Sequence, residues 1–158
     1  MGRSTYAVAV GSNRCGRHGR PAAEVAAALA RLKGRVVAAP VVTSAPLTPG
    51  QRTFANTVAL VETRAGPEKL LRRLKAIEAR FGRRRGRRWG PRVIDLDIVL
   101  WSEGCWGSRG LIIPHPAFRE RGFVLGPLLK LAPHWRDPIS GLTVRQLARR
   151  LTRPRPAL

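Results

Sequence analysis

Two segments of the 158-residue chain have the pattern of amphipathic helices, and they alternate with four strand-like runs. Each helical segment has a proline in its first turn, Pro21 or Pro67, and a glycine at its end, Gly34 or Gly82, as helices commonly do. Apolar residues repeat at helical spacing on the inner faces: Val25, Ala28, Leu29 and Leu32 in the first segment, and Leu70, Leu74, Ile77 and Phe81 in the second. The strand-like runs cover residues 5–10, 35–46, 53–63 and 93–101. The order along the chain is therefore strand, helix, strand, strand, helix, strand.

This order predicts an α+β fold, a ferredoxin-like βαββαβ sandwich in which helices cover one face of an antiparallel sheet. After residue 102 the pattern is weaker, with helices expected over residues 123–131 and 142–151 as a C-terminal helical extension. Residues 151–158 are expected to form a frayed tail. Because a chain of this length with 44% hydrophobic residues can bury one core, we expect a single domain over residues 1–158.

The charge of the chain is strongly positive, with 30 Lys and Arg against nine Asp and Glu and a formal net charge of +21. Such an excess favours an anionic partner, such as nucleic acid, nucleotide or phosphate. It can equally reflect an arginine-rich composition, since many of the arginines are scattered over the expected surface. The apolar run at residues 6–10 is much shorter than a signal sequence or a membrane span, so we expect a cytoplasmic protein without membrane association.

Two aspartates, Asp95 and Asp97, interrupt the last strand-like run. Alternate residues of a strand share a face, so the two Cβ atoms should lie roughly 7 Å apart, a span that can hold one or two Mg²⁺ ions. The alternative is an edge strand whose open face is hydrated. Six arginines fall within ten residues just before this run: Arg83, Arg84, Arg85, Arg87, Arg88 and Arg92. Because carboxylates with Mg²⁺ beside guanidinium groups are typical of phosphoryl transfer, this context favours the metal-site hypothesis.

Other candidate functional residues are of types that are unusual for the strand or loop in which they lie. The chain has neither a P-loop motif nor a G-x-G-x-x-G turn, so a nucleotide would have to bind in another way. Trp89, beside Gly90 and Pro91 in a basic loop, is expected to be exposed or to face a ligand. Asn56 lies in a strand, where asparagine is disfavoured, and its amide can both donate to and accept from a heterocycle. The triplet GSN at 11–13 is either a set of backbone donors or an ordinary turn.

Several motifs in this order and spacing resemble the 6-hydroxymethyl-7,8-dihydropterin pyrophosphokinase family. They are GSN at 11–13, F-x-N at 54–56, RRWGPR-x-IDLDI at 87–98, IPHP at 113–116 and RGFVLGPL at 121–128. The likeness extends from Ala7 to about Pro133. It implies a ferredoxin-like fold and transfer of the pyrophosphoryl group of ATP to the hydroxymethyl group of the pterin, with release of AMP, in folate biosynthesis.

The resemblance also implies roles for individual residues. The metal ligands would be Asp95 and Asp97, which hold two Mg²⁺ ions together with ATP. The catalytic set would be Arg83, Arg85, Arg92 and Asp97. ATP would contact Glu78, Arg85, Arg88, Trp89, Arg92, Ile98, His115 and Arg121, although Glu78 could instead form a salt bridge at the edge of the core. The pterin would contact Ser44, Pro46, Leu47, Phe54, Asn56, Trp89, Asp95 and Phe123.

Two alternative functions compete with this hypothesis. A basic RNA-binding module on a ferredoxin-like sheet would account for the net charge of +21. It would have no use for Asp95 and Asp97, which repel phosphate, so nucleic acid is not expected as a partner. A pseudoenzyme is disfavoured because both aspartates and the loop arginines Arg83 and Arg85 are present. The expected partners are thus ATP and 6-hydroxymethyl-7,8-dihydropterin, bound by a monomer.

Overall fold

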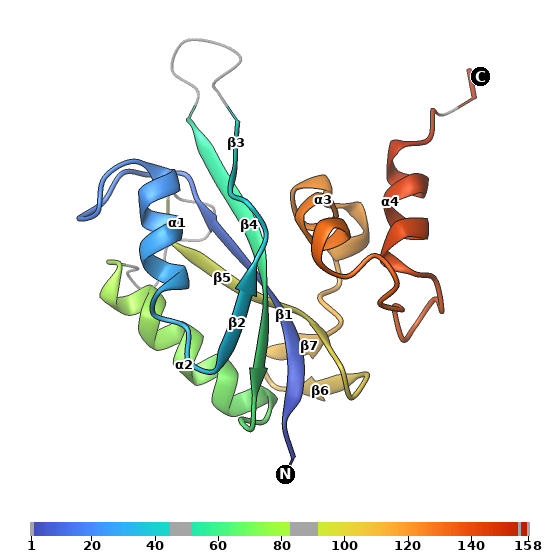
Figure 1. The fold of residues 1–158 in the computed structure, drawn as a ribbon, viewed down its shortest axis with the longest axis horizontal. Helices are drawn as coiled ribbons and strands as arrows, with labels where there is room; N and C mark the ends of the chain where they lie inside the picture. The colour runs from blue at the N-terminus through green and yellow to red at the C-terminus, as the bar shows by residue number, and fades with distance from the viewer. Residues whose placement is uncertain (1, 45–51, 83–91, 155, 158) are drawn as a thin grey trace.

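The computed structural model of the chain describes residues 2–44, 52–82, 92–154 and 156–157 (Figure 1). Within these residues, five antiparallel strands form the central sheet in the order β2-β4-β1-β5, and β3 pairs with β4 as well. The strands are β1 (Ser4–Ser12), β2 (Arg35–Ala38), β3 (Val42–Ser44), β4 (Phe54–Thr63) and β5 (Asp95–Trp101). The two longest strands, β1 and β4, lie side by side at the centre. The sheet therefore has the expected ferredoxin-like strand order.

Helices cover both faces of this sheet (Figure 1). The helices α1 (Pro21–Leu29) and α2 (Pro67–Arg80) pack on one face, where their apolar side chains join those of β1, β4 and β5 in the larger core cluster. The helices α3 (Gly122–Leu131) and α4 (Val144–Thr152) pack on the other face and form a second cluster. None of the described helices is long and apolar enough to cross a membrane. The predicted fold class and the C-terminal helical extension are thus confirmed.

Besides the first helix, which ends at Leu29 instead of at the expected Gly34, two local predictions differ from the structure. The expected strand over residues 35–46 is divided into β2 and β3, and the break falls at Ala39–Val41. Pro40 has no N–H to give to the sheet, and the Thr57 hydroxyl donates to the Ala39 carbonyl oxygen at 2.8 Å at this point. The second difference is a hairpin of β6 (Trp106–Ser108) and β7 (Leu111–Ile113), followed by the 3₁₀ helix η1 (Phe118–Glu120). Elements of three residues are too short to show a period in the sequence.

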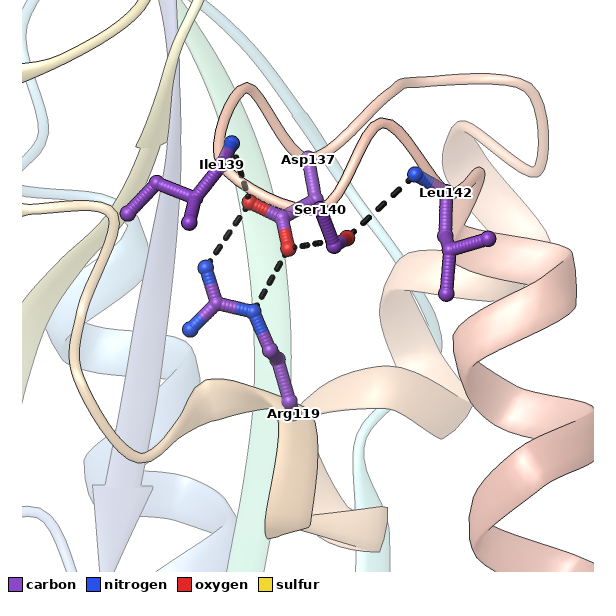
Figure 2. A network of polar contacts seen from close by, with 5 residues as sticks. All are labelled: Arg119, Asp137, Ile139, Ser140 and Leu142. Carbon is purple, nitrogen blue, oxygen red and sulfur yellow. Dashed lines mark hydrogen bonds and ion pairs between the residues drawn. The ribbon is translucent and has the colours of Figure 1, made fainter.

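An ion pair fixes η1 to the turn that precedes α4 (Figure 2). The Asp137 side chain, in a residue that is 1% exposed, accepts hydrogen bonds from Arg119 Nε at 2.5 Å and Arg119 Nη2 at 2.8 Å. It also accepts from the Ser140 hydroxyl at 2.6 Å and from the Ile139 N–H at 3.1 Å. These bonds fix the position of η1, and the neighbouring residues Phe118 and Arg121 line the cavity described below.

Candidate active site

The pairing of β1 with β5 places the two aspartates on the sheet face that carries α3. Asp95 lies opposite Gly11 and Asp97 lies opposite Ala9. Both aspartates are half-buried and line a cavity of about 600 Å³. This volume falls within the range of small-molecule sites, roughly 300–1,000 Å³. The prediction that the Asp95 and Asp97 side chains lie on the same face of the strand is confirmed.

Nine of the predicted site residues line this one cavity: Ser44, Phe54, Asn56, Arg92, Asp95, Asp97, His115, Arg121 and Phe123. They come from β3, β4, β5 and the residues just before it, the segment after β7, and the start of α3. Glu78 and Ile98 are buried on the opposite, α1 and α2 side of the sheet and do not line it. Six more lie outside the described residues: Pro46, Leu47, Arg83, Arg85, Arg88 and Trp89.

The charged groups of the cavity are arranged around the aspartate pair. Arg92 Nη1 donates to Asp95 Oδ1 at 3.0 Å. Burial raises the pKa of Asp97, and the charge of Asp95 raises it further, against the opposing effects of His115, Arg121 and Lys75. Arg92 offsets the charge of Asp95, whereas the raised pKa of Asp97 means that its ionised form is disfavoured, so the site favours binding of a further positive charge.

His115 is held in a defined orientation at the wall of the cavity. Its backbone N–H donates to the Val99 carbonyl oxygen of β5 at 2.9 Å, and its Nδ1 accepts from the Ala117 N–H at 3.1 Å. Burial lowers the pKa of His115, which outweighs the raising effect of Asp97, while Arg121 lowers the pKa further. A neutral imidazole whose Nδ1 is an acceptor carries its proton on Nε2. His115 therefore offers Nε2–H as a hydrogen-bond donor.

The donor set fits a divalent cation that arrives with a phosphate ligand. Among the described residues, no group of three or more His, Cys, Asp and Glu side chains could hold a metal ion. Of the described residues that line the cavity, Asp95 and Asp97 are the two that supply carboxylate oxygens. Mg²⁺ typically binds to one or two carboxylates, and substrate phosphates and water complete its coordination. The two aspartates therefore suit Mg²⁺ bound with a nucleotide better than a metal held by protein ligands only.

Comparison with known proteins identifies the chain. A family model described as 7,8-dihydro-6-hydroxymethylpterin-pyrophosphokinase (HPPK) matches residues 7–133. The chain belongs to the HPPK family. A Pseudomonas aeruginosa protein named 2-amino-4-hydroxy-6-hydroxymethyldihydropteridine pyrophosphokinase is 42% identical over 137 residues, which are 83% of this chain and 82% of that protein.

Other relatives of the HPPK chain match over a smaller part of their length. A Synechocystis protein of the same name is 42% identical over 99 residues, 63% of this chain and 51% of that protein. The folic acid synthesis protein fol1 of Pneumocystis carinii is 45% identical over 94 residues, 60% of this chain and 13% of that protein. The chain thus spans about half the length of the first relative and a small part of the second.

Glu78 lies on α2, away from the cavity in this HPPK chain, and its contact with ATP stays a prediction from the resemblance. It is 1% exposed, and its Oε2 accepts a hydrogen bond from the N–H of Leu96, the residue between Asp95 and Asp97, at 3.0 Å. Its Oε1 lies 3.5 Å from Lys75 Nζ. Of the two roles considered for Glu78, the structure shows the salt bridge. The side chain links α2 to β5 beneath the aspartate pair.

Asn13 is a site residue that the sequence interpretation missed. Its N–H donates to the Arg92 carbonyl oxygen at 3.1 Å, and the Arg92 N–H donates to Asn13 Oδ1 at 2.7 Å. These two bonds join the end of β1 to the residue that pairs with Asp95. The interpretation of GSN considered backbone donors or a turn, whereas the amide side chain is what fixes Arg92. The only signal in the sequence was the choice of asparagine, which can accept from a backbone N–H.

Gly11, the first residue of GSN, makes room for Asn56 on the neighbouring strand. A Cβ atom at position 11 would lie 2.8 Å from Asn56 Oδ1. If the pterin binds at Asn56, as the resemblance implies, Gly11→Ala should displace the Asn56 amide. The KM for the pterin should then rise by about tenfold, the effect of losing one good hydrogen bond, with little change in the KM for ATP. Steady-state kinetics with each substrate varied in turn would measure this. Gly126→Ala is the matched control, because nothing lies within 4 Å of its added Cβ. If the KM for the pterin is the same in Gly11→Ala and wild type, the Asn56 amide does not contribute to pterin binding.

The raised pKa of Asp97 predicts a measurable effect on stability. Ionised Asp97 is disfavoured in the folded state, so this group favours folding below its ordinary pKa of 3.8 and loses that contribution as the pH rises through the raised value. Without divalent cations, we expect Asp97→Asn to have a higher Tm than wild type at pH 7. The difference in Tm between Asp97→Asn and wild type should become smaller as the pH is lowered toward 4. Thermal unfolding across this pH range checks the prediction, and a lower Tm at pH 7 would contradict it.

Proposed function

We propose that this protein transfers the pyrophosphoryl group of ATP to the hydroxymethyl group of 6-hydroxymethyl-7,8-dihydropterin and releases AMP, a step of folate biosynthesis. One observation carries the proposal: the paired carboxylates of Asp95 and Asp97 share a single cavity with Phe54, Asn56 and Phe123. The carboxylates suit a Mg²⁺-nucleotide, and the aromatic and amide groups suit a planar heterocycle. Membership of the HPPK family supports the same reaction.

The pterin would bind beside the aspartates. Phe54 and Phe123 are 45% and 51% exposed, so ring faces are available for stacking on a flat ligand. Asn56 would exchange hydrogen bonds with the edge of the pterin, and Ser44, at the end of β3, lines the same side of the cavity. Pro46, Leu47 and Trp89 remain proposed pterin contacts from the sequence. This arrangement would direct the hydroxymethyl group toward Asp97.

The ATP phosphates would meet the basic groups of the cavity. Arg92 and Arg121 line it as cations, and His115 adds a neutral donor. Arg83, Arg85 and Arg88 remain proposed contacts with the phosphates, with Arg83 and Arg85 assigned to catalysis. The backbone of Ile98 remains a proposed contact for the nucleotide. These groups would balance the negative charge of the triphosphate and place its β-phosphorus before the pterin alcohol.

In the reaction, the alcohol oxygen forms a bond to the β-phosphorus. The bond from that phosphorus to the oxygen bridging the α-phosphate breaks, AMP leaves with the electron pair, and the alcohol proton passes to solvent or phosphate. Two Mg²⁺ ions, held by Asp95 and Asp97, would neutralise phosphate charge and lower the pKa of the alcohol. We propose that the protein is active as a monomer.

The test is AMP release from ATP, measured with and without the pterin and with Mg²⁺ replaced by EDTA. We expect AMP only when both pterin and Mg²⁺ are present, together with the pterin diphosphate. If AMP is absent while ATP binds to the folded protein, the proposal fails in favour of a binding protein without turnover. A protein that binds RNA and fails to bind ATP would instead support the RNA-binding alternative.

A further inference from the structure

A second cavity lies on the α1 and α2 side of the sheet and has no residue in common with the first. It has a volume of about 150 Å³ and lies between α2 and the segment that connects α1 to β2. Leu70, Leu74 and Ile77 contribute an apolar floor. Four cationic side chains line its rim: Arg31, Lys33, Arg73 and Arg80. We call it the basic groove.

The helical spacing of α2 brings its part of the basic groove together. Arg73, Ile77 and Arg80 lie at positions i, i+4 and i+7, so they share one face of the helix. Arg31 and Lys33 approach from the connection after α1. Lys69 and Arg72 are also exposed residues of α2, but they do not line the groove. The helix therefore carries two basic sets, of which one borders a cavity.

No acidic residue offsets the charge of the basic groove. The lining contains no Asp or Glu, and none of the ion pairs between described residues includes the four rim cations. Glu62 follows the lining residue Val61, but it lies beside Arg3, with 3.7 Å between Arg3 Nη1 and Glu62 Oε1. Four neighbouring cations without an acid repel one another, and a bound anion would remove this repulsion.

We infer that the basic groove binds a phosphate monoester that carries a short apolar substituent. The guanidinium groups of Arg73 and Arg80 suit phosphate oxygens, and the doubly charged group would offset the excess of cations. The apolar substituent would cover Leu70, Leu74 and Ile77. The volume of about 150 Å³ lies well below the roughly 300–1,000 Å³ of typical small-molecule pockets, so it suits a phosphate with a few carbon atoms better than a whole nucleotide. This site is separate from the reaction proposed above.

Butyl phosphate is the probe, and methyl NMR of the full chain is the measurement. The methyl groups of Leu74 and Ile77 report on the basic groove, while those of Val99 and Val124 report on the first cavity. Comparing these two sets of methyl groups distinguishes binding in the basic groove from phosphate binding beside the aspartates. We expect saturable shifts of the Leu74 and Ile77 methyls at concentrations that leave Val99 and Val124 unchanged.

A matched pair of double variants tests the role of the rim. Arg73→Gln with Arg80→Gln should weaken butyl phosphate binding at Ile77 by at least about tenfold, because hydrogen bonds to charged groups contribute that much. Lys69→Gln with Arg72→Gln removes the same charge from the same helix and should leave the affinity within about twofold. Equal weakening in both variants would overturn the proposal in favour of general charge attraction. Butyl phosphate shifts confined to Val99 and Val124 would also overturn the proposal. So would a result in which a ten-nucleotide single strand shifts the Ile77 methyl and butyl phosphate does not.

Discussion

Replacing Asp97 by asparagine is expected to abolish pyrophosphoryl transfer and to leave the fold intact. The substitution keeps the size of the side chain and removes one of the two carboxylates at the cavity. Loss of a preorganised charged group at a phosphoryl-transfer site should reduce kcat by about a thousandfold or more. The reduction should appear in AMP release at saturating ATP, pterin and Mg²⁺, while Tm should not fall.

The control for this prediction is Glu103→Gln, which removes an exposed acid from the turn between β5 and β6. We expect this variant to keep wild-type turnover, so a loss specific to Asp97 cannot be a result of net charge alone. If Asp97→Asn has a kcat within about tenfold of the wild-type value, Asp97 is not a required metal ligand. The proposed reaction could still hold in that case, with Asp95 and the phosphates as the metal ligands.

Replacing Asp137 by asparagine is expected to produce the largest loss of stability. Asp137 accepts two hydrogen bonds from Arg119 and one each from Ser140 and Ile139 (Figure 2). The substitution leaves Arg119 without its charged partner, and breaking a buried ion pair in this way costs about 3 kcal/mol or more. For a chain of this size, each kcal/mol lowers Tm by about 2–4 °C, so we expect a fall of at least about 6 °C at pH 7.

The pH dependence of this difference follows from the pKa of Asp137. Burial acts to raise this pKa, but hydrogen bonds from Arg119, Ser140 and the Ile139 N–H outweigh it and hold the pKa well below the ordinary value of 3.8. A lowered pKa stabilises the folded state above pH 3.8, and the contribution is lost as the pH falls toward the lowered value. The difference in Tm between wild type and Asp137→Asn should therefore stay constant from pH 7 to pH 5 and shrink below pH 4.

A double variant distinguishes the ion pair from simple loss of packing. If Asp137→Asn is destabilised because it leaves the charge of Arg119 unpaired, then the double variant Arg119→Met with Asp137→Leu should be more stable than Asp137→Asn. Urea unfolding of the three proteins would measure the free energies of unfolding. A double variant less stable than the single one would instead assign the effect to the bonds of Asp137 with Ser140 and Ile139.

Several features of the HPPK chain were predictable because their causes are local in the sequence. Prolines mark the starts of α1 and α2, Gly82 follows the end of α2, and apolar spacing identifies the inner faces of both helices. The alternation of β5 puts Asp95 and Asp97 on one face wherever the strand lies in the sheet. Residue type and spacing therefore predicted the element order and the metal-site hypothesis. The predicted roles of Arg83, Arg85, Arg88 and Trp89 rest on the sequence alone, because these positions lie outside the described residues.

Other features depend on contacts between residues distant in the chain. Asn13 meets Arg92 across 79 positions, and Glu78 reaches the N–H of Leu96 across 18. Neither contact leaves a period or a motif in the sequence, because each exists only when the strands and helices have been placed. The basic groove is of the same kind, since its cations come from two segments that meet only in the fold. The sequence by itself determined which residues share a strand or helix face; the tertiary structure decided which of these faces meet, and so which charged groups have partners.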